Sequence, residues 1–196
     1  MSLGGIWIDH LGSKEESVIS SEMKCLREKR DGKHYHVTVM NHLEIRKITS
    51  TLIEENSPKK QKHGLALKKV EDIVNRHFGS ADAWEQPVDL GLGRCTSENK
   101  KAVSFYRVVA WPFGQEIRKL LKLGFTNFHI TCGYTPNDVH EYKGPATLLC
   151  LEDGMPCSLQ DATLLTSMIT YYAHDRLFLE KLQAMCRRHG YNQLLN

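Results

Sequence analysis

The sequence predicts an α+β fold with antiparallel sheets flanked by helices over residues 5–156, followed by a C-terminal helical hairpin over residues 157–196. Two observations predict it. Short runs that are apolar, or that alternate apolar and polar residues, recur in the first region and are separated by apolar residues at helical spacing. The last region shows helical spacing alone. With 196 residues, the chain is long enough for one main domain with a small appendage.

The predicted strands are short runs bounded by turn-forming residues. They cover residues 6–8, 35–40, 88–94, 102–111, 128–133 and 146–151. The polar residues 96–101 predict a turn, so the third and fourth strands are expected to form a hairpin. Residues 35–40 alternate strictly, which is typical of a half-buried strand.

The predicted helices show apolar residues three and four positions apart, or a charged and mildly helical composition. They cover residues 13–30, 43–53, 67–78, 115–123, 158–172 and 175–189. Ser158 with Asp161 resembles a capping box, and Gly79, Gly124 and Gly190 are placed to end helices. Residues 54–63 are expected to form an exposed loop, whose three lysines are either solvated or available to phosphates.

Composition excludes several classes of protein. With 41% hydrophobic and 25% charged residues, the chain is neither disordered nor collagen-like, and no apolar run approaches the roughly 20 residues that cross a membrane. The six cysteines include no C-x-x-C pair, so we expect free thiols, no metal site, and a reducing cytoplasmic or nuclear compartment. The net charge of +3 does not by itself indicate a nucleic-acid-binding protein, and stable binding to duplex DNA is not expected.

Two segments share one local pattern, in which a histidine and a threonine two positions apart lie between apolar residues. The segments are residues 35–39 (Tyr-His-Val-Thr-Val) and residues 128–132 (Phe-His-Ile-Thr-Cys). Ten histidines should produce about one H-x-[ST] by chance, but about 0.08 when three apolar flanks are also required. Two occurrences are therefore informative.

Strand geometry gives the pattern a chemical meaning. Side chains at i and i+2 share one face, so His36 projects with Thr38, and His129 projects with Thr131, while their apolar neighbours enter the core. If the two strands line one cleft, a phosphodiester between them meets a base, an acid and two hydroxyl donors. Histidine suits both roles, because its ordinary pKa near 6.5 allows one ring to be neutral and the other protonated. No metal or other cofactor is required.

These motifs and the residues around the second one resemble the 2H phosphoesterases, in particular the Swiss-army-knife branch connected with RNA repair. The resemblance covers roughly residues 5–150 and is carried by residues 89–94 (Asp-Leu-Gly-Leu-Gly-Arg), 105–112, 128–134 and the polar residues 138–144. It implies two pseudo-symmetric lobes with antiparallel sheets, an active cleft between the lobes, and an RNA end or a nucleotide as the substrate. A 2′,3′-cyclic phosphate is the favoured substrate. Either histidine can be the acid under this pseudo-symmetry.

Four further residues are expected to contact the substrate: His34, Arg94, Tyr134 and Lys143. Tyr134 either stacks on a base or packs at the rim, and the loop at residues 135–144 is either a lid or a plain loop. Two other functions remain open, a non-catalytic RNA-end or nucleotide-binding module, and a metal-dependent phosphoesterase that uses His34, His36 and His42. The sequence does not indicate the oligomeric state.

Overall fold

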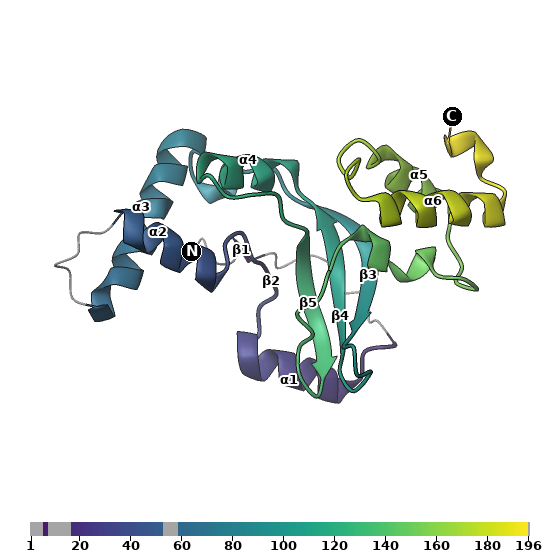
Figure 1. Cartoon of the computed structure of the whole chain (residues 1–196), viewed down its shortest axis with the longest axis horizontal. Helices are drawn as coiled ribbons and strands as arrows, with labels where there is room; N and C mark the ends of the chain where they lie inside the picture. Colours follow the sequence, from purple (N-terminus) through teal and green to yellow (C-terminus); the bar gives the residue numbers. More distant parts are fainter. Residues whose placement is uncertain (1–5, 8–16, 53–58, 196) are drawn as a thin grey trace. The chain divides into compact units, whose positions relative to one another are not determined.

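The computed structural model describes residues 6–7, 17–52 and 59–195 of the chain. Their contacts define two compact units (Figure 1). The first unit is drawn from residues 1–9, 36–87 and 111–126, and the second from residues 10–35, 88–110 and 127–196. Antiparallel strands and helices occur in the described parts of both units, so the predicted α+β class with C-terminal helices is confirmed.

The first unit combines a small two-stranded sheet with helices. Strands β1 (Ile6–Trp7) and β2 (His36–Val37) pair antiparallel, with Trp7 opposite His36. The helical elements among its described residues are α2 (His42–Leu52), α3 (Lys59–Phe78), the 3-10 turn η1 (Ala81–Ala83) and α4 (Pro112–Leu120). The α3 boundary corrects one expectation, because the lysines predicted to lie in a loop at 54–63 belong to the first turn of a helix. Residues 53–58 lie outside the described residues.

A buried arginine connects the elements of this unit. The Arg118 guanidinium on α4 donates to the carbonyl of Val39 (2.6 Å), the carbonyl of Gly124 (2.8 Å) and the Glu44 carboxylate (2.7 Å). Glu44 also accepts from the backbone N–H of Asn41, at the start of α2. Burial alone raises the pKa of Glu44, but the bonds from Arg118 and Asn41 outweigh it and hold that pKa below its usual value. Arg118 therefore fixes the chain immediately after β2.

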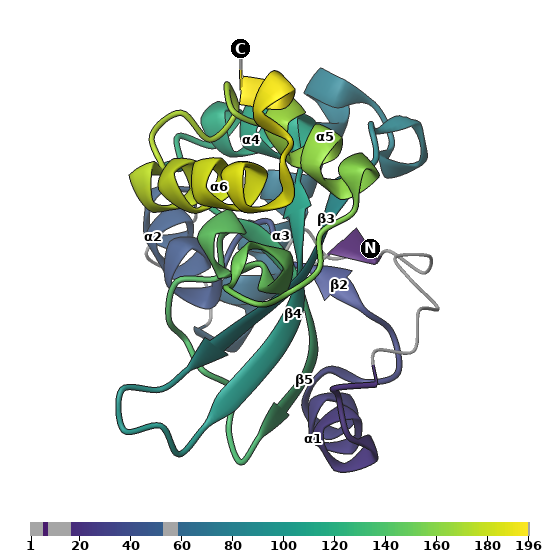
Figure 2. The same ribbon diagram turned by 90° about the vertical axis from the view of Figure 1, so that its right-hand side faces the viewer.

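The second unit is built on a three-stranded antiparallel sheet of order β3-β4-β5 (Figure 2). The strands are β3 (Val88–Thr96), β4 (Val103–Ala110) and β5 (Phe128–Thr135), and the predicted hairpin joins the first two. Helix α1 (Ser21–Asp31) packs against β5. It begins at Ser20, whose hydroxyl accepts from the N–H of Met23, and ends at Gly32, whose φ of 81° suits glycine.

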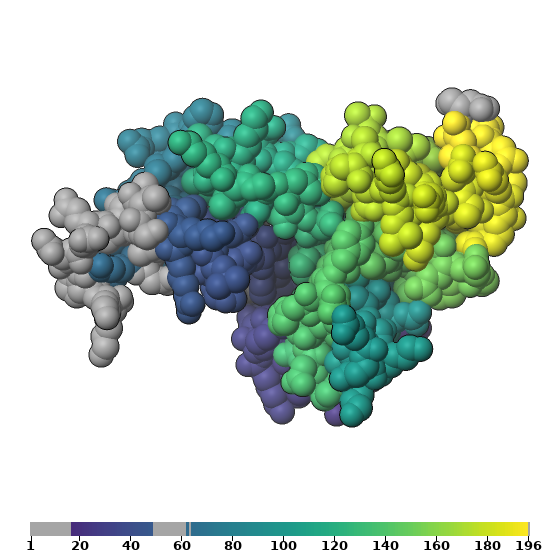
Figure 3. Space-filling view, viewed as in Figure 1, coloured from purple at the N-terminus to yellow at the C-terminus, as the bar shows by residue number. Residues whose placement is uncertain are grey.

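The C-terminal helices share a hydrophobic core with this sheet. Helices α5 (Leu159–Ser167) and α6 (Arg176–His189), with the short turn η4 (Asn192–Leu195), lie against the segment that precedes them in the chain (Figure 3). Both predicted caps are present, the Ser158–Asp161 capping box and Gly190 with a left-handed φ of 75°. Buried residues of the sheet and of both helices belong to one cluster, which includes Tyr106, Val108, Leu148, Leu165 and Phe178.

One predicted strand is wrong. Residues 146–151 form two single 3-10 turns, η2 (Pro145–Thr147) and η3 (Leu149–Leu151), and Leu148 makes one isolated bridge to Gly93. The apolar run indicated burial correctly, because Ala146, Leu148 and Leu151 are all buried. Burial alone does not determine backbone conformation, and the proline at position 145 favours a turn start over a strand.

Replacing Arg118 with alanine should destabilise the first unit by about 3 kcal/mol, because it leaves a partly buried carboxylate and two backbone carbonyls without their donor. The measurement is the free energy of unfolding in urea at neutral pH. The neighbouring Lys119→Ala is the matched control, since its ion pair with Glu116 is exposed and should contribute at most about 0.5 kcal/mol. Equal effects of the two substitutions would contradict the role given to Arg118.

Candidate functional site

The first motif places its polar side chains as the strand pattern predicts. Val37 and Val39 are 0% exposed, whereas His36 and Thr38, which alternate with them, are half-buried. The paired strand is shorter than expected, because in the described residues the ladder with β1 reaches only His36 and Val37. His34 therefore lies before β2, in an exposed bend that follows α1.

The second motif lies on β5, at the edge of the three-stranded sheet. Phe128 and Ile130 are buried on one face, and His129 and Thr131 are half-buried on the other. The register places Val108 opposite His129 and Tyr106 opposite Thr131, so these four side chains share one face. A bulge follows, at Cys132, and shifts the register for the rest of the strand.

Two contacts fix the orientation of the His129 ring. Its Nδ1 lies 3.3 Å from the carbonyl oxygen of Asn127, which can only accept, so Nδ1 carries the proton in this hydrogen bond. The ring of Tyr106 stands edge to face with the imidazole, with centroids 5.7 Å apart and an interplanar angle of 67°. This tautomer makes Nε2 the nitrogen that can exchange a proton with a substrate.

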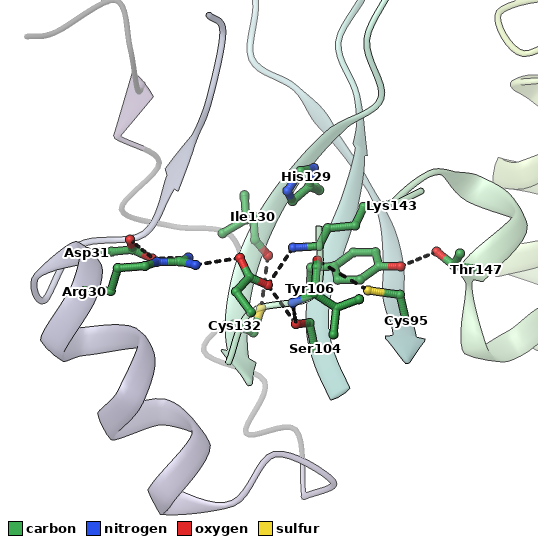
Figure 4. A network of polar contacts seen from close by, with 12 residues as sticks. Arg30, Asp31, Cys95, Ser104, Tyr106, His129, Ile130, Cys132, Lys143 and Thr147 are labelled. Atoms are coloured by element: carbon green, nitrogen blue, oxygen red, sulfur yellow. Dashed lines mark hydrogen bonds and ion pairs between the residues drawn. The ribbon is translucent and has the colours of Figure 1, made fainter. Parts of the chain in front are cut away.

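A group of charged and polar residues, mostly buried but including the exposed Arg30, lies on the same face of the sheet (Figure 4). The Asp138 carboxylate accepts from the Lys143 ammonium (2.7 Å), the Arg30 guanidinium (2.6 Å) and the Ser104 hydroxyl (2.7 Å). Lys143 also lies over the Tyr106 ring, 5.4 Å from its centroid. We call Arg30, Ser104, Asp138 and Lys143 the Asp138 cluster.

The electrostatics of this cluster are dominated by its cations. Burial alone raises the pKa of Asp138, but Lys143, Arg30 and the Ser104 hydroxyl outweigh burial and lower that pKa to about 2. Hydrogen bonding to Asp31, together with Asp138, raises the pKa of Arg30 despite its partial burial. Asp138 is therefore ionised at all physiological pH values, and its negative charge offsets two positive charges at the sheet face.

The structure places some of the residues that were predicted to contact the substrate near His129, and others away from it. Lys143 is brought to this face, but it is only 6% exposed and is bound to Asp138. Tyr134 is buried, its hydroxyl donates to the carbonyl of Leu26, and Arg30 covers its ring. Arg94 is exposed and pairs with Glu152, and strand alternation directs it to the face opposite Gly93 and Cys95. The rim-packing alternative for Tyr134 fits these contacts.

Sequence reasoning missed Tyr106, Ser104 and Arg30 as neighbours of the second motif. Tyr106 and Ser104 belong to a strand that is mostly apolar, so their pattern is that of core residues. Arg30 is 108 positions from Asp138. The available signal was alternation, because Ser104, Tyr106 and Val108 share one face of β4, and a polar residue on that face needs a partner.

No three His, Cys, Asp or Glu side chains of the described residues, His34, His36 and His42 among them, form a group that could hold a metal ion. No helix in the described residues is long and apolar enough to cross a membrane.

An α+β fold with two segments that each carry a half-buried His and Thr two positions apart, the first beginning on β2 and the second on β5, is the phosphodiesterase-type architecture of a known class. The family model described as Swiss Army Knife, 2H phosphoesterase domain, matches residues 1–140 of the chain, a range that includes both motifs. The chain therefore belongs to the 2H phosphoesterase family. Searches of curated proteins and of solved structures find no match. Lys143, η2, η3 and the C-terminal helices lie beyond the matched range.

Acid should weaken the fold through Asp138. Its folded pKa of about 2 lies below the usual value of 3.8, so the ionised carboxylate stabilises the fold above pH 4, and this stabilisation is lost as pH falls toward 2. The difference corresponds to about 2 kcal/mol. We expect Asp138→Asn to be less stable than the unsubstituted protein at pH 6 and to lose less stability between pH 5 and pH 2, measured by urea unfolding.

The matched control for this acid series is Asp153→Asn, because the Asp153 side chain is fully exposed despite its contact with Arg188. Its pH dependence should follow that of the unsubstituted protein. An Asp138→Asn variant with the unsubstituted pH dependence would show that the Asp138 cluster is not the source of the acid sensitivity.

Proposed function

We propose that the protein is a metal-independent phosphodiesterase that hydrolyses a 2′,3′-cyclic phosphate at an RNA end or on a related nucleotide. In this proposal, His36 and His129 act on one phosphodiester, and the hydroxyls of Thr38 and Thr131 donate to its non-bridging oxygens.

The observation that carries the proposal is the common burial pattern of the two motifs. In each motif, a histidine and a threonine two positions apart are half-buried, and two of the three apolar residues that alternate with them are buried, Val37 with Val39 and Phe128 with Ile130. A histidine that only fills a core needs no hydroxyl beside it on the same strand face. The match of the 2H phosphoesterase family over both motifs supports the same interpretation.

The reaction needs one base and one acid. A neutral imidazole takes a proton from water while the water oxygen bonds to phosphorus, the bond from phosphorus to one ribose oxygen breaks, and the other, protonated imidazole gives its proton to that oxygen. The product is a phosphomonoester with a free ribose hydroxyl, and the two histidines have exchanged protonation states. For His129, Nε2 is the nitrogen that takes part, because Nδ1–H is bound to Asn127.

The proposal does not assign a direct phosphate contact to every residue predicted from the sequence. Arg94, Tyr134 and Lys143 are each engaged by other groups of the protein. His34 is exposed and precedes the first motif, so it remains a proposed substrate contact. Its substitution should raise KM for an RNA end and leave kcat nearly unchanged.

His36→Ala and His129→Ala should each lower kcat on 2′,3′-cyclic nucleotides by about 10²-fold or more, because each removes one of two required proton-transfer groups. The double variant should be hardly worse than either single variant, since the two groups act as a unit. The control is His77→Ala, which removes an exposed histidine at the end of α3. Assays contain a chelator, and the substrate panel includes cyclic mononucleotides and RNA ending in a cyclic phosphate.

The alternatives predict other results. A non-catalytic binding module would bind the cyclic ends without turnover. A metal-dependent enzyme would lose activity with chelation and regain it with zinc or manganese. Independent, additive effects of the two histidine substitutions would contradict action on one phosphodiester.

A further inference from the structure

The catalytic histidine proposed on β5 packs against an aromatic residue, Tyr106, that lies outside both His-x-Thr motifs. Tyr106 is 0% exposed and lies opposite Thr131 on the neighbouring strand. Its ring meets the His129 ring at 67°, the edge-to-face arrangement in which the positive edge of one ring approaches the negative face of the other. With Nδ1–H bound to Asn127, the imidazole is held by two groups.

Tyr106 is itself fixed on several sides. Its hydroxyl donates to the Thr147 hydroxyl (2.7 Å), which in turn donates to the carbonyl of Gly144 (2.6 Å). The Lys143 ammonium lies over the ring and is held by Asp138. Lys143, Gly144 and Thr147 lie beyond the range that matches the family, whereas Asp138 lies within it.

On the neighbouring strand, Gly93 allows the Tyr106 ring to lie close to the backbone. A Cβ at position 93 would lie 2.7 Å from Cε2 of Tyr106 and 3.0 Å from the Thr147 hydroxyl oxygen. Any larger residue there would displace the ring. Gly93 is thus required by close approach and not by an unusual φ.

The phenol of Tyr106 is unsuited to proton transfer. Burial raises its pKa above the usual value, so the hydroxyl remains protonated, and it is engaged with Thr147. The ring nevertheless touches the imidazole directly. Any contribution of Tyr106 to catalysis therefore comes from holding the His129 ring in position.

We propose that Tyr106 is a positioning residue for His129, and that Lys143, held by Asp138, and the close approach of Gly93 keep the Tyr106 ring in place for this task. The inference rests on the proposed function, since it concerns the same histidine. A catalytic group displaced by about 1 Å can cost about 10²-fold in rate without any loss of substrate affinity. The ring of Tyr106, and not its hydroxyl, is the part that matters most.

The kinetic experiment compares Tyr106→Phe, which keeps the ring, with Tyr106→Met, which fills much of the same space with a flexible chain. On a 2′,3′-cyclic nucleotide, Tyr106→Met should lower kcat about 10- to 100-fold with KM changed less than about 2-fold, and Tyr106→Phe should stay within about 3-fold of the unsubstituted kcat. Thr147→Val removes the same hydroxyl contact as Tyr106→Phe and should match it. An unchanged kcat for Tyr106→Met, or an equal loss for Tyr106→Phe, would overturn the inference.

A second readout needs no substrate. Long-range ¹H–¹⁵N NMR spectra of His129, recorded above its titration, should show the Nδ1–H tautomer in the unsubstituted protein and in Tyr106→Phe. Tyr106→Met should give a mixture of tautomers. If Tyr106→Met does not fold, Gly93→Ala is used in its place. The added Cβ displaces the Tyr106 ring and leaves every polar group present. A single unchanged tautomer in the displaced variant would overturn the inference.

The two readouts separate the two proposals. If the unsubstituted protein hydrolyses none of the cyclic phosphates, the proposed function fails, and the tautomer spectra alone decide whether Tyr106 positions His129. If hydrolysis occurs and the substitutions at position 106 behave alike, the function stands and the positioning role fails.

Discussion

The carboxylate of Asp138 connects three parts of the second unit, and the arrangement of its sheet face depends on it. Arg30 reaches it from α1, Ser104 from β4, and Lys143 from the segment that follows β5. Breaking one partner out of a buried ion pair typically costs about 3–5 kcal/mol, because the remaining charge stays in a poorly solvating environment. The Ser104 hydroxyl also accepts from the N–H of Val139, so the backbone of the loop is attached together with its charge. The residues after β5 are therefore anchored to the sheet, and those anchors position Lys143 over Tyr106.

In the first unit, a buried arginine connects the elements around the histidine motif, as the Asp138 carboxylate does in the second unit. Its paired strand is only two residues long, which is too short to hold a histidine by ladder hydrogen bonds alone. Arg118 compensates by binding the carbonyl of Val39, directly after the motif, and the first turn of α2 through Glu44. In both units, a buried side chain that forms an ion pair lies beside the segment that carries a half-buried histidine. This supports the view that each histidine is held in place rather than merely tolerated.

Much of the fold could be predicted from the sequence because its signals are local. The β3–β4 hairpin, the caps at Ser158 and Gly190, and the alternation in both motifs each depend on residues a few positions apart. The predictions failed where contacts between residues far apart in the sequence determine the local structure. Residues 146–151 look like a strand because they are apolar, but they pack as 3-10 turns beneath the C-terminal helices. Tyr106 could not be recognised as a neighbour of His129, since the pairing of β4 with β5 sets that contact. Lys143 was expected at the substrate, but it is bound to Asp138, whose other cationic partner, Arg30, is 108 positions away in the sequence and was not foreseen.

The shared core of the sheet and the C-terminal helices affects how the family domain can be isolated. Leu148, Leu165 and Phe178 cover the sheet face that bears Tyr106 and Val108. A fragment trimmed to residues 1–140 would expose the side chains of Tyr106 and Val108 to water. Such a fragment would keep both histidine motifs and still be prone to self-association. The C-terminal helices therefore complete the hydrophobic core of this sheet, and any minimal version of the protein has to include them.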